Sequence, residues 1–270
     1  MKQTPKIRTA SNSPSNYNGG ITIKSPDEIE SMRKAGAVVS AAITAIKSAV
    51  RPGVTTADLD ELAEQVIRGL GAVPTFKGYR GFPGSICTSV NEEIVHGIPG
   101  NRVLMEGDLL KVDVGATVEG LIGDAAVTVP VGRISDEAQE LIKVTRQALE
   151  EGIKAAVGGA RTGDVGSAIE RYVAAHELSG VREYVGHGVG RFLHEDPQVP
   201  NYGPAGMGTL LRPSMAIAIE PMVNIGGWKT KLLEDQWTVI TEDGSLSSHF
   251  EHTIVITDGE PEVLTRETVG

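Results

Sequence analysis

Apolar residues recur every three or four positions over residues 26–50, a spacing that predicts one buried side of a long helix. The Ser-Pro-Asp-Glu stretch at 25–28 supplies a serine cap, a proline at the first helical position and a glutamate three residues after the cap. The helix should end before Arg-Pro-Gly at 51–53, because proline and glycine interrupt helices. The expected buried positions are Ile29, Met32, Ala35, Val39, Ala42, Ile43 and Ile46.

A second helix is predicted to begin near residues 55–56, and this turn and helix recur later in the chain. Residues 53–59 match residues 159–165 at a constant offset of 106, and a helix is expected before each copy, the later one over about 136–157. Turn and cap chemistry favours Gly, Thr and Asp anyway, so chance is the alternative. The paired helices favour a duplicated unit, with a site where the two halves meet. The matching pairs are Thr56 with Thr162, Asp58 with Asp164 and Glu64 with Glu170, and the second helix should bury Leu59, Leu62, Ala63, Val66 and Ile67.

Strand-forming residues follow the helices. They gather in 84–98, 108–131, 214–225 and 236–257. The second of these stretches should contain a hairpin of 109–116 and 121–129 that turns near Glu119-Gly120. We therefore expect an α+β protein, an antiparallel sheet with helices on its outer side. The expected organisation is a single domain over 21–265, with halves of about 21–131 and 132–265, a disordered tail at 1–20 and a C-terminal tail at 266–270.

Composition narrows the class of protein. The 270 residues are 40% hydrophobic and 22% charged, which suffices for one large core. A net charge of −10 without a basic cluster argues against nucleic acid or an anionic membrane as the main partner. The single cysteine, Cys87, cannot form an intrachain disulfide and fits a reducing cytoplasm. No apolar run approaches the roughly 18 residues of a membrane span, and residues 1–20 lack the apolar run of a secretory signal.

Two aspartates are expected to share one face of the predicted hairpin. Alternate residues face opposite sides of a strand, so Asp113 lies opposite the apolar positions on either side of it. A turn at 119–120 pairs position 113 with 126, which makes Asp124 the diagonal neighbour of Asp113, about 7–8 Å away along the backbone. Such acids repel each other unless a cation lies between them. An exposed acidic sheet face is the alternative, but the small residues on this face leave room for a cation.

Two glutamates lie in strands whose composition indicates burial. Apolar residues surround Glu220 on both faces of its strand, and Glu251 begins an apolar stretch. A buried carboxylate is costly unless it is paired, protonated or bound to a metal, and the basic residues that would pair with these two are sparse here. Together with the aspartates they carry −4, which two divalent ions neutralise. Oxygen ligands with one imidazole suit Mn²⁺, Fe²⁺, Co²⁺ or Zn²⁺.

Residues 187–197 are predicted to form a glycine-broken loop that carries two of the six histidines, His187 and His194. Histidines on such a loop are candidates for metal ligation or proton transfer, although a lone histidine is more often structural. The His-Glu pair at 194–195 does not continue to His-Glu-x-x-His, so a zincin helix is excluded.

Taken together, these stretches resemble the motifs of the type I methionine aminopeptidases, which belong to the pita-bread metallopeptidase family M24. The resemblance covers about residues 21–265, and the matching stretches are 87–99, 112–114 with 123–124, 186–190, 192–197, 219–223 and 250–253. It implies the pita-bread fold, with two halves related by a pseudo-two-fold axis. It also implies removal of the initiator methionine from nascent proteins and peptides, preferentially before a small second residue. The implied cofactor is a pair of divalent ions (Fe²⁺, Mn²⁺, Co²⁺ or Zn²⁺) with a bridging water or hydroxide.

The resemblance also implies which residues hold the two metals. Asp124 and Glu251 would bridge them, Asp113 would hold one metal, and His187 with Glu220 would hold the other. Glu220 is further expected to shuttle a proton between water and the leaving amine.

By the same resemblance, His96 and His194 contact the substrate near the scissile amide and steady the tetrahedral intermediate. Asn91 and Ser247 resemble a position for a structural monovalent cation, and Arg80 stands where relatives often carry a histidine. The implied pocket for the methionine side chain consists of Tyr79, Phe82, Cys87 and Trp237. The remaining histidines are interpreted as structural or surface residues, namely His176, His249 and His252.

Two alternatives remain open at this stage. A proline-directed aminopeptidase of the same fold usually carries a further N-terminal domain, which residues 1–20 cannot form. A non-catalytic peptide-binding module typically loses metal ligands, whereas here every ligand position is filled. A type II methionine aminopeptidase is disfavoured because the 33 positions from His187 to Glu220 leave no room for its helical insertion. The expected partners are N-termini that begin with methionine and the ribosome, and the expected enzyme is cytoplasmic and monomeric.

Overall fold

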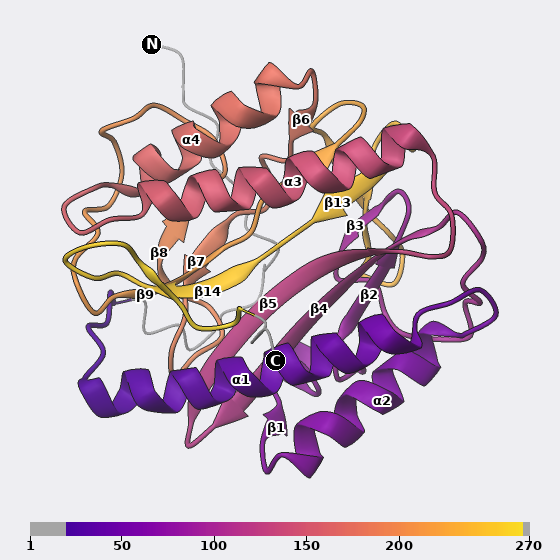
Figure 1. The fold of residues 1–270 in the computed structure, drawn as a ribbon, viewed down its shortest axis with the longest axis horizontal. Helices are drawn as coiled ribbons and strands as arrows, with labels where there is room; N and C mark the ends of the chain where they lie inside the picture. The colour runs from indigo at the N-terminus through magenta and orange to yellow at the C-terminus, as the bar shows by residue number, and fades with distance from the viewer. Residues whose placement is uncertain (1–19, 267–270) are drawn as a thin grey trace.

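The computed structural model describes residues 20–266, so the tails expected at 1–20 and 266–270 lie outside the described residues except for their inner ends. Figure 1 shows two helix pairs on opposite sides of the view, with the strands β4, β5 and β14 between them. The helices are α1 (Pro26–Ala49), α2 (Thr56–Gly69), α3 (Asp136–Ala155) and α4 (Thr162–Ala175), with a short 3-10 turn at Tyr79–Gly81. Within residues 20–266 no helix is both long and apolar enough to cross a membrane.

The first helix forms as the sequence predicts. The Ser25 hydroxyl accepts the Glu28 N–H at 3.2 Å, and the Glu28 carboxylate accepts the Ser25 N–H at 2.8 Å, which completes a capping box. All seven predicted positions of α1 are buried. In α2 the prediction is partly wrong, because Leu62 and Val66 are only half-buried.

Strands form two larger sheets and two smaller ones. In the first half, β4 lies between β5 and β2, while β1 adds to its far end; the second half has the order β15-β14-β9-β7-β8. Two three-stranded sheets, β13-β10-β6 and β11-β12-β3, complete the set. The bounds are β1 Val73–Pro74, β2 Cys87–Val90, β3 Glu93–Val95, β4 Leu109–Val118, β5 Leu121–Pro130, β6 Ser179–Gly180, β7 Gly186–Gly188, β8 Glu195–Val199, β9 Ala216–Ile219, β10 Met222–Asn224, β11 Thr230–Leu232, β12 Val239–Thr241, β13 Ser247–His249, β14 His252–Val255 and β15 Glu262–Val263.

The β4–β5 hairpin has the predicted register. Asp113 pairs with Ala126 and Gly115 pairs with Asp124, so the two aspartates are diagonal neighbours on one face. Positive φ angles at Glu119 and Gly120 (52° and 79°) form the tight turn. The opposite face packs against α1 and α2 through Leu110, Val112, Val114 and Ala116.

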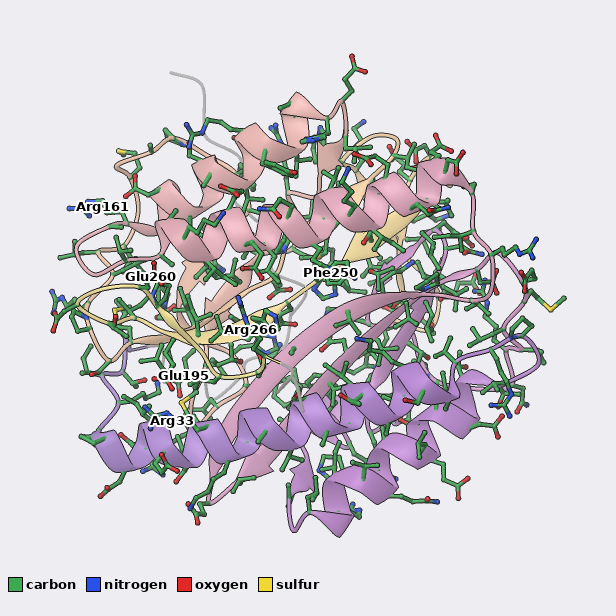
Figure 2. The ribbon with its side chains drawn as sticks, viewed as in Figure 1. Arg33, Arg161, Glu195, Phe250, Glu260 and Arg266 are labelled. Carbon is green, nitrogen blue, oxygen red and sulfur yellow. The ribbon has the colours of Figure 1, made fainter. Side chains whose placement is uncertain are left out.

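The strands predicted over 214–225 and 236–257 are each broken, which the sequence interpretation missed. One break falls at Glu220-Pro221, between β9 and β10, and the other at Phe250-Glu251, between β13 and β14. Proline has no N–H to give to a ladder, and pairing resumes on each side, with Ile219 opposite His252 and Met222 opposite His249. Figure 2 shows Phe250 at this break, between the two helix pairs. Both glutamates therefore lie at matched interruptions of the sheet.

The loop predicted over 187–197 is only partly a loop. Gly186–Gly188 forms β7 and Glu195–Val199 forms β8, so His187 sits in a strand. An added Cβ at Gly186 would lie 2.3 Å from the Ala218 carbonyl oxygen, and one at Gly188 would lie 2.2 Å from that of Asp196. Glycine therefore serves here to let neighbouring strands approach closely, rather than to end regular structure.

The two halves share a hydrogen-bonded turn at the start of α2 and α4. Leu104 exchanges two backbone hydrogen bonds of 2.8 Å with residues 53–54, and Leu211 exchanges bonds of 3.0 and 2.8 Å with residues 159–160. Each half also has its own hydrophobic cluster under its helix pair. The sequence offset of 106 thus corresponds to a repeated structural unit. The α+β architecture with antiparallel sheets and outer helices is confirmed.

Candidate metal centre and active site

The structure brings the five predicted metal ligands together between the halves. The His187 Nε2 atom lies 3.9 Å from Asp124 Oδ2 and 3.5 Å from Glu220 Oε1. Asp124, His187 and Glu251 each offer an atom within 4.8 Å of the others. The carboxylate of Asp113 contacts that of Asp124. Backbone hydrogen bonds between Glu251 and Ala126, of 2.9 and 3.3 Å, fix the second break against β5.

The orientation of His187 leaves one ring nitrogen free to bind a cation. Its Nδ1–H donates to the Gly188 carbonyl at 2.9 Å, so the Nε2 lone pair faces the acids. Burial lowers the pKa of His187 to about 4, which keeps the ring neutral at pH 7.

The charged forms of the four acids are disfavoured in this site. Burial raises the pKa of Asp113 to about 7, and burial together with the neighbouring acids raises the pKa of Asp124, Glu220 and Glu251 well above the usual range. Oxygen atoms of Asp113, Asp124 and Glu251 are buried without a hydrogen-bond partner among the described residues. Acceptor atoms left in this state, around one neutral imidazole, fit divalent cations.

Two further predicted histidines lie beside this cluster. The rings of His187 and His194 have centroids 4.4 Å apart. His96 lies near both rings: its charge would lower the pKa of His194, and the charge of His187 would lower the pKa of His96. Burial lowers the pKa of His96 to about 4 and that of His194 well below its usual value. Both rings are therefore neutral at pH 7, and each retains one N–H donor.

The four predicted pocket residues lie in or against one apolar cluster. Phe82 and Cys87 are buried in it, and Tyr79 and Trp237 pack against it half-buried. The Phe82 and Trp237 rings meet edge to face with centroids 5.0 Å apart. Exposed Arg80 covers the Tyr79 ring at 5.3 Å, so a positive charge lies at this rim.

Comparison with known proteins agrees with this geometry. The family model described as metallopeptidase family M24 matches residues 30–258. The chain belongs to this family. It is 51% identical to methionine aminopeptidase 1 of Bacillus subtilis, covering 91% of this chain and 99% of that one, and 52% identical to the methionine aminopeptidase of Clostridium acetobutylicum, covering 91% and 98%.

Solved structures of similar proteins have the same fold as this chain. The methionine aminopeptidase of Thermotoga maritima aligns with a TM-score of 0.90 at 49% identity, over 92% of this chain and 100% of that one. The Xaa-Pro dipeptidase of Bacillus anthracis aligns with a TM-score of 0.72 at 24% identity, over 90% and 62%, which shows a shared fold alone. The resemblance to type I methionine aminopeptidases and the pita-bread fold are thus confirmed, and this chain is a metal-dependent aminopeptidase.

Lys111 is a buried residue beside the site that the sequence does not single out. Its side chain is 2% exposed, and its Nζ donates to the Asn91 carbonyl at 2.6 Å. Burial lowers the pKa of this amine to about 7. Asn91 and Ser247 are the two residues expected near a monovalent cation. The Asn91 carbonyl accepts hydrogen bonds from the Lys111 amine and, at 3.1 Å, from the Ser247 N–H. The alternation of β4 could have placed Lys111 on the Asp113 face, but not against Asn91.

The remaining histidines lie in three different environments. His176 is exposed, and His252 is half-buried beside Thr265. His249 is 1% exposed and lies beside Glu220 and Glu251, so of the two interpretations, structural or surface residue, the surface one does not apply to it. Position 249 is two residues before Glu251, and period-two alternation was the available signal for a shared face.

Proposed function

We propose that this aminopeptidase removes N-terminal methionine from peptides and nascent proteins, using two divalent cations. The observation that carries the proposal is the convergence of four carboxylates with raised pKa values around one imidazole nitrogen, those of Asp124 and Glu251 buried and those of Asp113 and Glu220 half-buried. The match to proteins named methionine aminopeptidase, which covers 91% of this chain at 51–52% identity, supports methionine as the residue removed. The residues that would hold the cations are Asp113, Asp124, His187, Glu220 and Glu251, with Asp124 and Glu251 as bridges.

A pair of divalent cations would supply a hydroxide nucleophile at neutral pH and polarise the scissile carbonyl. Any of Mn²⁺, Fe²⁺, Co²⁺ and Zn²⁺ suits these ligands. Glu220 lies at the strand break with one oxygen 3.5 Å from His187, where it can accept a proton from the attacking water and pass it to the leaving amine. Neutral His96 and His194 can donate N–H hydrogen bonds to the oxygen on which negative charge develops.

The apolar cluster beside the acids would bind the methionine side chain. Phe82 and Trp237 present aromatic edges, which favour a thioether by about 0.3–1.5 kcal/mol per contact. We propose, from the resemblance to type I methionine aminopeptidases, that a small second residue in the substrate is favoured. Arg80 at the rim would meet residues further along the peptide.

The direct test is cleavage of Met-Ala-Ser by the purified chain with each of the four cations. Free methionine is the expected product, measured by mass spectrometry, and Asp113→Ala should abolish its release because one cation loses its carboxylate. Peptides that begin with leucine should remain intact. Cleavage of Xaa-Pro peptides in preference to Met-Ala-Ser would favour the proline-directed alternative, and no cleavage with any cation would favour a binding module.

Tyr79→Phe is expected to lower kcat for Met-Ala-Ser about 5- to 10-fold with little change in KM, the effect of losing one hydrogen bond of about 1 kcal/mol. The Tyr79 hydroxyl lies 2.8 Å from His194 Nδ1, and burial raises the pKa of this phenol, so it stays protonated and donates. His194 then carries its proton on Nε2. Steady-state kinetics should separate this change from Phe82→Leu, which should mainly raise KM. An unchanged kcat in Tyr79→Phe would contradict a role in fixing the His194 tautomer.

A further inference from the structure

His249 lies within the acid cluster and has no place in the mechanism described above. It is the last residue of β13 and is 1% exposed. Its Nε2 atom lies 3.9 Å from Glu220 Oε2 and 4.0 Å from Glu251 Oε2. Neither ring nitrogen has a hydrogen-bond partner among residues 20–266. A buried imidazole in this state bears the desolvation cost of both ring nitrogens without a compensating hydrogen bond, so a bound state that satisfies them is favoured.

The backbone holds this ring in place. The Thr128 hydroxyl accepts the His249 N–H at 2.9 Å and donates to the His249 carbonyl at 2.8 Å, and His249 pairs with Met222 of β10. Thr128 belongs to β5, the strand that also carries Asp124. The ring is thus positioned by the same strands that position the metal ligands.

Glu220 lies between two histidines, His187 and His249, whose ring nitrogens differ in their hydrogen bonding. His187 faces Oε1 with a lone pair, because a carbonyl already binds its Nδ1–H. His249 faces Oε2, and no carbonyl or hydroxyl binds either of its nitrogens. Ionised carboxylate oxygens only accept hydrogen bonds, so the tautomer that satisfies this site carries the proton on His249 Nε2.

We propose that His249 is a positioning residue whose Nε2–H, 3.9 and 4.0 Å from the carboxylate oxygens of Glu220 and Glu251, comes within hydrogen-bond range of these carboxylates when the cations bind and orients them. This inference rests on the proposed metal site. Hydrogen bonds to ligating carboxylates from outside fix their orientation, and their loss typically lowers metal affinity 10- to 100-fold. His249 acts through the two glutamates and does not contact the cations.

Calorimetric titration of the metal-free chain with Mn²⁺ and Co²⁺ tests this role. His249→Leu fills the space without a donor and should weaken cation binding 10- to 100-fold. His249→Gln retains a side-chain N–H and should bind within about threefold of the wild type. The visible absorption of bound Co²⁺ should change in the leucine variant and stay the same in the glutamine variant, which a purely packing role would not produce. If the leucine variant lacks a cooperative thermal transition, His249→Asn, whose amide is too short to reach the glutamates, takes its place.

The outcomes separate this inference from the proposed function. Equal cation affinity in the wild type and the leucine variant would overturn the inference alone. Binding by the glutamine variant as weak as that of the leucine variant would also overturn it, because the ring itself would then be a ligand. Absence of cation binding to the wild type would overturn the proposed metal site and this inference together.

Discussion

Asp124→Asn is expected to lower kcat/KM for Met-Ala-Ser at least 10³-fold, which corresponds to about 4 kcal/mol of transition-state stabilisation. Asp124 is the acid in contact with both ends of the cluster, since it touches Asp113 and lies 3.9 Å from His187 Nε2. An amide in its place carries no charge and cannot bridge two cations. The number of cations bound per chain, measured by metal analysis after gel filtration, should fall with the activity.

The local backbone should survive this change. Thr253 Oγ1 accepts the Asp124 N–H at 3.0 Å and donates to the Asp124 carbonyl at 2.8 Å, and neither bond involves the altered side chain. Asp60→Asn is a matched control, because Asp60 is a half-buried acid that accepts the Ser85 and Ile86 N–H groups and is not one of the proposed metal ligands. That variant should lose stability but keep the wild-type number of cations. Full activity in Asp124→Asn would contradict the bridging role.

Local pattern predicted the part of the site that lies in one hairpin. Asp113 and Asp124 are eleven residues apart, and the turn at residues 119–120 together with strand alternation fixes their register without any other part of the chain. Glu220 and Glu251 stand out in the sequence as acids within apolar strands, but their proximity depends on pairing of β9 with β14, which no local pattern specifies. The resemblance to a known family supplied that link.

The features that sequence interpretation missed are all non-local. The paired breaks at 220–221 and 250–251 place two carboxylates outside the ladder, and each break is stabilised by strands from elsewhere in the chain. His249 shares a face with Glu251 by alternation, but its contact with Glu220 arises only when β10 pairs with β13. Lys111 is likewise buried against a carbonyl some 20 residues earlier. Burial of a polar group can be predicted locally, whereas its partner cannot.

In the metal-free protein, Asp113→Asn is expected to stabilise the fold progressively as pH rises. The pKa of Asp113 is about 7 in the folded chain and 3.8 in the reference state, so between these values the unfolded chain releases a proton that the folded chain retains. Raising the pH therefore destabilises the wild type through this group, by about 1.4 kcal/mol per unit, and asparagine removes the effect. The difference in free energy of unfolding should grow by about 2 kcal/mol from pH 5 to pH 7 and level off about one pH unit above the folded pKa.

Comparing the two proteins is necessary because buried histidines act in the opposite direction. The pKa of His96 and of His187 is lowered to about 4, so each stabilises the fold as pH rises toward 6.5, and this contribution is common to both proteins. Urea unfolding at several pH values, in the presence of a chelator, measures the difference. Saturating Mn²⁺ should reverse its sign, because the cation binds the folded wild type and stabilises it by mass action. A difference that does not change with pH would show that Asp113 is ionised in the metal-free fold, and the electrostatic argument for cation binding at this carboxylate would then fail.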